Sequence, residues 1–164
     1  MTGAEIRAMQ RTEIEAYLEA QDFSGRVLDF GCGTQPYRGI VERKGGEYTG
    51  YNRGHFPGGS KEDIGPEEPL SDTWDVILCT QSTQYYPDVL AMLVEFRLAA
   101  ERLVMTFATN WPEVEVEDLH RFTRTGMQHL LELAGWQVVA VKRLGELPFG
   151  DRESLALGYG MTAV

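Results

Sequence analysis

Residues 26–33 read Arg-Val-Leu-Asp-Phe-Gly-Cys-Gly, a short apolar run that carries one carboxylate and ends in two closely spaced glycines. The run favours a buried strand, and Gly31 and Gly33 favour a tight turn directly after it. Pro36 suits the first turn of a helix because its φ is fixed, and we expect that helix to reach about Lys44. The stretch therefore predicts a strand, a glycine turn and a helix in succession.

The rest of the chain alternates in the same way. An amphipathic helix is expected over residues 4–20, within an N-terminal covering segment that spans 1–22. Further strands are expected at 48–52, 61–64, 74–79, 102–108, 136–141 and 155–164, and further helices at 88–100 and 123–135, capped by Asp88 and Thr123. The glycines of the last strand favour an antiparallel edge position. The pattern predicts one α/β domain over 1–164, Rossmann-like and doubly wound, with a mostly parallel sheet and an antiparallel last strand.

Composition excludes several classes of function. The 164 residues fit a single domain, and 25 acidic against 15 basic residues give a formal net charge of −10, which opposes binding to nucleic acid or to anionic lipid. The longest apolar stretch, residues 89–94, is far shorter than the roughly 20 residues that cross a bilayer. Cys32 and Cys79 form neither a disulfide framework nor a zinc pattern. We therefore expect a cytoplasmic protein that binds neither membranes nor nucleic acids.

The carboxylate of Asp29 decides which ligand the glycine turn is expected to take. Open α/β sheets bind ligands beyond the carboxyl ends of their strands, where this turn lies. A dinucleotide would bring its pyrophosphate to the turn, and Asp29 would repel it, so a nicotinamide enzyme is disfavoured. A ligand that carries an ammonium or sulfonium group would be attracted instead. Two glycines alone would also fit a purely structural turn.

Residues 27–34, Val-Leu-Asp-Phe-Gly-Cys-Gly-Thr, resemble motif I of the class I S-adenosylmethionine-dependent methyltransferases. Further stretches are similar to that family in the right order: residues 48–52 to its second strand, 62–64 to its adenine loop and 74–81 to its fourth strand. His120-Arg-Phe-Thr123, before a helix that ends Leu-Ala-Gly-Trp, resembles the later part of the small-molecule "type 11" subgroup. The resemblance covers most of the chain.

The resemblance implies S-adenosyl-L-methionine as the cofactor and names the residues that would bind it. These are Asp29, Gly31, Cys32 and Gly33 at the methionine end, Asn52 and Arg53 after the second strand, Asp63 and Ile64 at the adenine, and Thr80 and Gln81 near the transferred methyl group. Two positions depart from the family pattern. Asn52 stands where a carboxylate usually accepts both ribose hydroxyls, which would cost charge-assisted strength of about 1 kcal/mol, and Gln35 replaces the third glycine of motif I.

The acceptor side is expected to follow the fourth strand and to include the polar segment before Thr123. We expect His120 as a general base and Tyr85 as a second catalytic residue, with Tyr86, Trp111 and Arg121 lining the acceptor. The alternatives are that His120 and Arg121 anchor the segment by hydrogen bonds and that the tyrosines pack beneath it. The acidic residues 113, 115, 117 and 118 fit a solvated loop face, and we expect no metal site.

The sequence thus predicts a methyltransferase that uses S-adenosylmethionine to methylate an oxygen, nitrogen or carbon atom of a small-molecule acceptor. Because a fold does not fix the chemistry, the acceptor stays open. The alternative from a different class is a non-catalytic cofactor-binding or regulatory module on the same scaffold, which Asn52 and Gln35 motivate. Self-association to a homodimer is also left open.

Overall fold

The computed structural model describes residues 2–52, 69–110, 118–149 and 153–164. In chain order its elements are α1 Gly3–Glu19, β1 Gly25–Phe30, α2 Arg38–Arg43, β2 Gly46–Tyr51, the 3₁₀ helix η1 Pro69–Ser71, β3 Trp74–Thr80, the 3₁₀ helix η2 Thr83–Tyr85, α3 Val89–Ala99, β4 Ala100–Ala108, α4 Arg124–Leu133, β5 Val138–Phe149 and β6 Glu153–Ala163. The expected alternation of helices and strands is confirmed. The strand expected at 61–64 lies outside the described residues.

The strands form one mixed sheet in the order β2-β1-β3-β4-β6-β5. The first four are parallel to one another, whereas β6 is antiparallel to both β4 and β5. This order confirms the predicted α/β fold, in which a mostly parallel, Rossmann-like sheet carries an antiparallel last strand. It also brings the carboxyl ends of β1, β2 and β3 to the same edge of the sheet.

The edge position expected for the last strand is wrong, because β6 lies between β4 and β5 and the edge strand is β5. The glycines of β6 have a different cause, which is close approach from neighbouring elements. A Cβ atom at Gly158 would lie 2.3 Å from the carbonyl oxygen of Phe107, and one at Gly160 would lie 2.7 Å from the ring of Tyr17. These glycines therefore make room for β4 on one side and α1 on the other.

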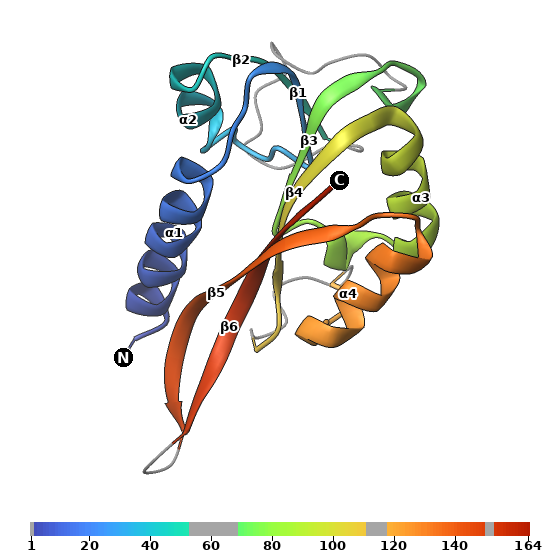
Figure 1. The fold of residues 1–164 in the computed structure, drawn as a ribbon. Coiled ribbons are helices and arrows are strands. Elements are labelled where there is room, and N and C mark those ends of the chain that lie inside the picture. The colour runs from blue at the N-terminus through green and yellow to red at the C-terminus, as the bar shows by residue number, and fades with distance from the viewer. Residues whose placement is uncertain (1, 53–68, 111–117, 150–152) are drawn as a thin grey trace.

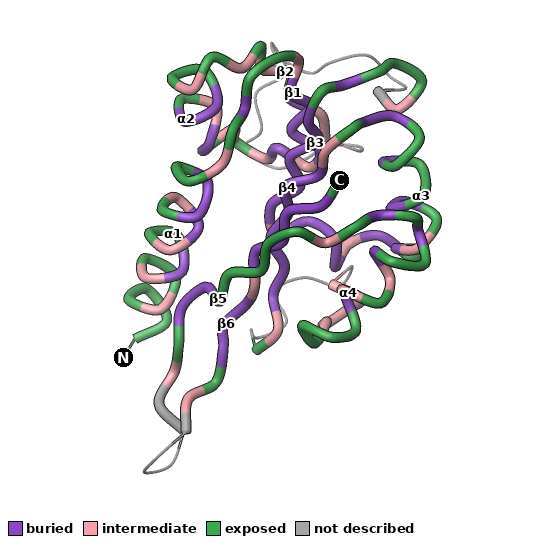
Figure 2. The backbone as a smooth tube through the Cα atoms, viewed as in Figure 1, coloured by how far each residue is buried: buried purple, intermediate pink, exposed green. Residues whose placement is uncertain are grey.

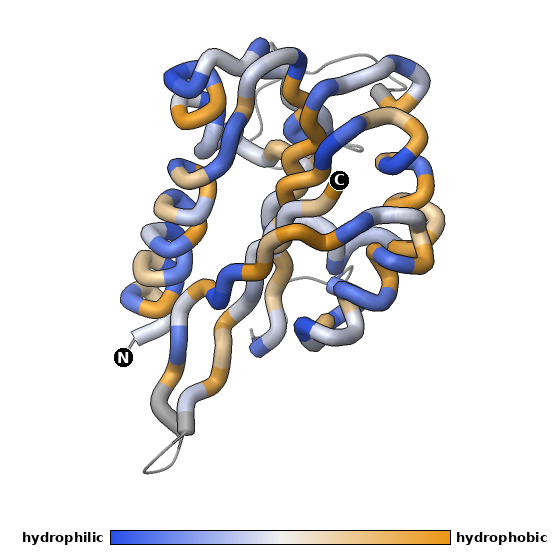
Figure 3. The backbone as a smooth tube through the Cα atoms, in the orientation of Figure 1, coloured by the Kyte–Doolittle hydropathy of each residue, from blue (hydrophilic) through white to orange (hydrophobic). Residues whose placement is uncertain are grey.

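Helices cover both faces of the sheet, α1 and α2 on one and α3 and α4 on the other (Figure 1). Each face has its own apolar core: Val27, Val76 and Val104 pack with α1 and α2, whereas Leu28 and Ile77 pack with α3 and α4. Buried residues follow the central strands in Figure 2, and Figure 3 shows both hydrophobic and hydrophilic residues within the turns of α1. The sheet is thus doubly covered, as the apolar run at β3 predicts.

The helix ends agree with the capping residues that the sequence predicts. Asp88 accepts a hydrogen bond from the backbone N–H of Ala91 at 2.9 Å, and Thr123 accepts one from Gly126 at 3.0 Å. Gly135 follows α4 with a φ of +87°, a value that favours glycine. None of the helices in the described ranges is both long enough and apolar enough to span a membrane.

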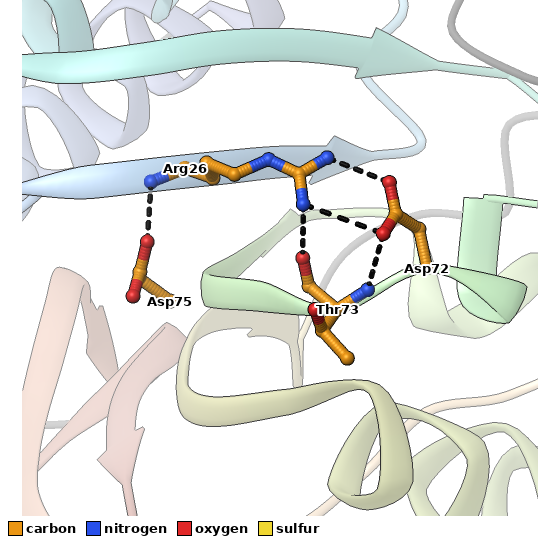
Figure 4. A network of polar contacts seen from close by, with 4 residues as sticks. All are labelled: Arg26, Asp72, Thr73 and Asp75. Atoms are coloured by element: carbon orange, nitrogen blue, oxygen red, sulfur yellow. Dashed lines mark hydrogen bonds and ion pairs between the residues drawn. The ribbon is translucent and has the colours of Figure 1, made fainter.

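A polar network joins β1 to β3 at their amino ends, far from the glycine turn (Figure 4). The guanidinium of Arg26 pairs with Asp72, donates to the carbonyl of Thr73 at 2.7 Å and lies over the ring of Trp74 at 4.5 Å. The backbone N–H of Arg26 donates to the carboxylate of Asp75 at 2.6 Å. Because the Arg26–Asp72 pair is nearly half exposed, its contribution to stability is small, and we assign it to strand alignment.

One buried hydrogen bond fastens the covering helix α1 to the sheet. The hydroxyl of Tyr17 lies 2.9 Å from that of Thr162 in β6, and the Thr162 hydroxyl donates in turn to the side-chain carbonyl of Gln21 at 2.8 Å. Replacing Tyr17 with phenylalanine should lower the free energy of unfolding by about 1 kcal/mol, because one buried bond is lost while the ring still packs. Urea unfolding measures the change, and an unaltered midpoint would contradict the role of this bond.

Candidate functional site

The ends of β1, β2 and β3 meet around the glycine turn. Gly31 and Gly33 have φ values of +80° and +55°, so both adopt the left-handed conformation that glycine tolerates best. The N–H groups of Gly31 and Cys32 both donate to the carbonyl of Tyr51, at 2.8 and 3.1 Å, and the hydroxyl of Ser82 donates to the carbonyl of Phe30 at 3.2 Å. Hydrogen bonds to the end of β2 and to the side chain of Ser82, just after β3, therefore fix the turn.

The N–H groups of the turn point toward β2. That of Gly33 donates to the side-chain oxygen of Asn52 at 2.8 Å, so all three N–H groups of residues 31–33 have partners at the end of β2. A pyrophosphate bound at such a turn would need these donors. The geometry therefore disfavours a dinucleotide on grounds independent of charge.

Asp29 lies at the centre of this arrangement and is fully buried. One carboxylate oxygen accepts a hydrogen bond from the hydroxyl of Tyr48 at 2.7 Å, whereas the other has no hydrogen-bond partner among the described residues. No arginine or lysine of the described part of the chain forms an ion pair with this carboxylate. A buried carboxylate with one unsatisfied oxygen is costly in the ligand-free protein.

The surroundings of Asp29 change its acidity. Burial raises the pKa of the Asp29 carboxyl to about 7, and the hydrogen bond from Tyr48 opposes that rise. Burial and the neighbouring Asp29 also raise the pKa of the Tyr48 phenol well above its ordinary value, so Tyr48 stays a hydrogen-bond donor. Near neutral pH the carboxyl can therefore be ionised by a cation that reaches its unsatisfied oxygen.

The thiols at the site are not nucleophiles. Burial raises the pKa of both Cys32 and Cys79 to about 12, so both stay protonated near neutral pH. The sulfur of Cys79 lies 3.2 Å from the hydroxyl of Ser82, a contact within the packed strand end. Cys79 is fully buried and therefore belongs to the packed core at this strand end.

Asn52 and Gln35, which depart from the family pattern, both have defined places in the turn. The side chain of Asn52 accepts from the N–H of Gly33 and donates to its carbonyl at 3.1 Å, so both ends of the amide are engaged. Gln35 has a φ of +58° and so adopts the left-handed conformation. A non-glycine residue in this conformation stores strain of about 1 kcal/mol.

The end of β3 carries the residues expected near the transferred methyl group. Thr80 is the last residue of the strand and is buried, and Gln81 follows with a left-handed φ of +51°. The side chain of Gln81 donates to the hydroxyl of Thr106 at 3.2 Å, and the backbone carbonyl of Gln81 accepts from the side chain of Gln84 at 2.7 Å. Strained, well-held residues of this kind occur frequently at functional sites.

The segment expected to cover the acceptor lies against η2. The N–H of Leu119 donates to the carbonyl of Gln84 at 2.9 Å, and Nε2 of His120 lies 2.9 Å from the carbonyl of Tyr86. Arg121 pairs with Asp118, whose side chain is 2% exposed. These contacts correspond to the anchoring alternative for His120 and Arg121, although a role in catalysis is compatible with them.

The tyrosines expected on the acceptor side differ in burial. Tyr86 is 9% exposed and packs on Phe30, with 5.4 Å between the ring centroids, whereas Tyr85 is partly exposed. Tyr86 thus belongs to the core between the sheet and α3. Arg53, Asp63, Ile64 and Trp111 lie outside the described residues.

Two residues of the candidate site, Tyr48 and Ser82, were not predicted from the sequence. Tyr48 holds one oxygen of Asp29, and Ser82 closes the turn against Phe30. The signal for Tyr48 was the strand period: Gly50 pairs with Asp29 across the sheet, so Tyr48, two residues earlier, shares its face. Using it requires the register of β1 and β2, which the sequence does not state.

Unsatisfied buried polar atoms gather at this end of the molecule. Among the described residues they are Oδ1 of Asp29, Nε2 of Gln35, Oγ1 of Thr83, Oε1 of Gln84 and, elsewhere, Nε2 of Gln10. Four of these five belong to residues at or just after the carboxyl ends of β1 and β3. Unsatisfied groups are rare in folded proteins, so a cluster of them favours a place that a ligand or ordered water completes. A cofactor with a cationic group would fit the donor set, because Asp29 supplies the anion.

No group of three or more potential metal ligands is found within the described ranges.

No protein-family model matches the sequence, and no curated protein matches it either. Solved structures do. The mitomycin 7-O-methyltransferase MmcR has a TM-score of 0.66 at 18% identity, and the match covers 93% of this chain and 52% of MmcR, so this chain spans about half the length of that enzyme. The complex of DhpI with S-adenosylhomocysteine (SAH) has a TM-score of 0.73 at 12% identity and covers 99% and 87% of the two chains.

A third match is the Burkholderia thailandensis 1,6-didemethyltoxoflavin-N1-methyltransferase, solved with 1,6-didemethyltoxoflavin and SAH bound. It has a TM-score of 0.70 at 17% identity and covers 95% of this chain and 77% of that one. At these identities the matches are evidence of a shared architecture. The chain therefore has the fold of the class I S-adenosylmethionine-dependent methyltransferases.

Proposed function

We propose that the protein transfers a methyl group from S-adenosylmethionine to an oxygen, nitrogen or carbon atom of a small-molecule acceptor. The fold supports this proposal, since two of the similar structures are bound to SAH and one of these also holds a small-molecule ligand. The observation that carries it is the unsatisfied, fully buried oxygen of Asp29 beside the glycine turn.

Asp29 would receive the ammonium group of the cofactor, directly or through one bridging water. Tyr48 holds the other carboxylate oxygen at 2.7 Å and so fixes the direction in which the free oxygen points. The cofactor supplies an activated methyl group on its sulfonium. The chain contributes orientation, which is a major source of rate in such a displacement. Gln81, which follows the carboxyl end of β3 with a left-handed φ, would face the reacting groups.

His120 would take the proton of the acceptor through Nδ1. Its Nε2 lies 2.9 Å from the carbonyl of Tyr86, and since a carbonyl can only accept, Nε2 must carry the hydrogen. The neutral ring then has its basic lone pair on Nδ1. The same hydrogen bond that anchors the segment therefore selects the tautomer that a general base needs.

Replacing His120 with glutamine and with alanine separates anchoring from base catalysis. Alanine removes the hydrogen bond to Tyr86 and should lower the free energy of unfolding by about 1 kcal/mol, whereas glutamine keeps a donor and should cost less. Glutamine lacks a basic nitrogen, so turnover of an acceptor found by screening should fall about 100-fold or more. Full turnover by His120→Gln would restrict His120 to anchoring.

The proposed function is tested by calorimetric titration with SAH, followed by transfer of a labelled methyl group to a panel of phenols, amines and activated carbon acids. Binding together with transfer supports it. Absence of SAH binding would overturn it, and binding without transfer to any acceptor would favour the non-catalytic module.

A further inference from the structure

Asn52 extends the pairing of β2 beyond the end of the strand. The backbone carbonyl of Tyr51 accepts from Gly31 and Cys32, and the Asn52 side chain then takes the N–H of Gly33 at 2.8 Å and donates to its carbonyl at 3.1 Å. The amide thus imitates the backbone of one more paired residue. The two bonds hold the peptide groups on either side of Gly33, whose φ of +55° is left-handed.

A carboxylate at this position could not make the same contacts. It would still accept from the N–H of Gly33, but its second oxygen would face the Gly33 carbonyl, where the donor of Asn52 now lies. Two acceptors at about 3 Å repel each other, and neither can supply the hydrogen. The turn of this chain therefore selects an amide.

We propose that Asn52 is a positioning residue that clamps the peptide of Gly33 and thereby shapes the cofactor-binding turn, in place of serving as a ligand for the ribose hydroxyls. The inference rests on the proposed function, since it assigns the turn to the cofactor. It differs from the expectation that the family resemblance carries, in which this position accepts the ribose hydroxyls.

Two variants test the clamp through SAH affinity. Asn52→Ala should weaken binding of SAH and of its 2′,3′-dideoxy analogue by the same factor, about fivefold or more, because the turn is affected and the ribose is not. Asn52→Asp should weaken SAH binding at pH 8. Part of the affinity should return at pH 4, where a carboxyl with the ordinary pKa of about 4 is about half protonated and can again donate to the Gly33 carbonyl. Affinities are expressed relative to wild type at each pH, because Asp29 titrates in every protein.

Asn110→Asp is the matched control. The Asn110 side chain donates to the carbonyl of Ala156 at 2.8 Å, so the same substitution removes a similar bond away from the glycine turn. Its SAH affinity should follow wild type at both pH values. Circular dichroism verifies that all variants are folded.

Tighter SAH binding by Asn52→Asp at pH 8 would overturn the clamp and favour Asn52 as a ribose ligand. The same conclusion would follow if Asn52→Ala lost affinity for SAH but kept its affinity for the dideoxy analogue. A second measurement needs no cofactor. The Gly33 amide should exchange its hydrogen at least tenfold faster in Asn52→Ala than in wild type, and unchanged exchange would also overturn the clamp. Failure of wild type to bind SAH would refute only the proposed function, because the exchange experiment still decides the role of Asn52.

Discussion

Replacing Asp29 with asparagine is expected to raise the free energy of unfolding at pH 8 by about 1–3 kcal/mol while weakening SAH binding at least tenfold. Asp29 is fully buried, the only hydrogen bond to its carboxylate within the described residues comes from Tyr48, and one carboxylate oxygen is unsatisfied. Asparagine can still accept from Tyr48 but carries no charge to desolvate. The residue that costs stability in the free protein would thus be the one that binds the cofactor.

The pH dependence follows from the same burial. The pKa of Asp29 is raised to about 7 in the folded protein, above the value of about 4 for an exposed carboxyl. Such a group contributes its full stability below pH 4, and that stability is lost as the pH rises from 4 through 7. The difference in stability between Asp29→Asn and wild type should therefore grow in favour of the variant over this window.

Chemical denaturation at pH 5, 7 and 8 measures this difference, and titration with SAH measures the binding. Asp72→Asn is the control, because it removes an exposed carboxylate at the opposite end of the sheet that pairs with Arg26. Asp72→Asn should be less stable than wild type by the same amount at all three pH values. The hydrogen bonds from Arg26 lower the pKa of Asp72 below its ordinary value, so this carboxylate is ionised in both the folded and the unfolded protein from pH 5 upward. An Asp29→Asn variant that is less stable than wild type at pH 8 would contradict the claim that the unsatisfied carboxylate destabilises the ligand-free protein.

Replacing Gly31 with alanine should lower the free energy of unfolding by about 2–4 kcal/mol and abolish SAH binding. Two effects add at this position. Its φ of +80° is unfavourable for alanine, and the new Cβ atom would lie 2.6 Å from both Cβ and Oγ of Ser82. Relief of this clash requires the ends of β1 and β3 to move apart, which would deform the turn.

Gly45→Ala is the matched control for the part of the stability loss that comes from the left-handed φ alone. Gly45 has a φ of +86° but nothing lies within 4 Å of a Cβ atom built there, so this substitution should cost only about 1 kcal/mol. Adding Ser82→Gly to Gly31→Ala should recover the part of the stability loss that is due to the clash with Ser82. Equal losses in the Gly31 and Gly45 variants, measured by urea unfolding, would show that Ser82 does not confine the turn.

Local signals account for the parts of the fold that the sequence predicted. Asp88 and Thr123 precede apolar helices and cap them, and the apolar run at β3 is buried on both faces. The position of β6 depends instead on which neighbour approaches Gly158 and Gly160, a contact between residues far apart in the chain. Sequence periodicity carries no information about such a neighbour.

The candidate site likewise contains residues that local sequence signals predict and residues that depend on tertiary contacts. Asp29, Gly31 and Gly33 were predictable because a carboxylate and two glycines stand together in one short stretch. The partners that give them their properties come from other strands: Tyr48 holds Asp29, and Asn52 holds Gly33. Their roles depend on the register of β1 against β2, which is set by tertiary packing.

The most direct test of the buried carboxylate uses SAH and its analogue that lacks only the amino group, each titrated into wild type and Asp29→Asn. The account predicts that wild type binds SAH at least tenfold more tightly than the deaminated analogue and that this preference disappears in the variant. Equal affinity of wild type for the two ligands, or a preference that survives in Asp29→Asn, would contradict the assignment of Asp29 to the ammonium group.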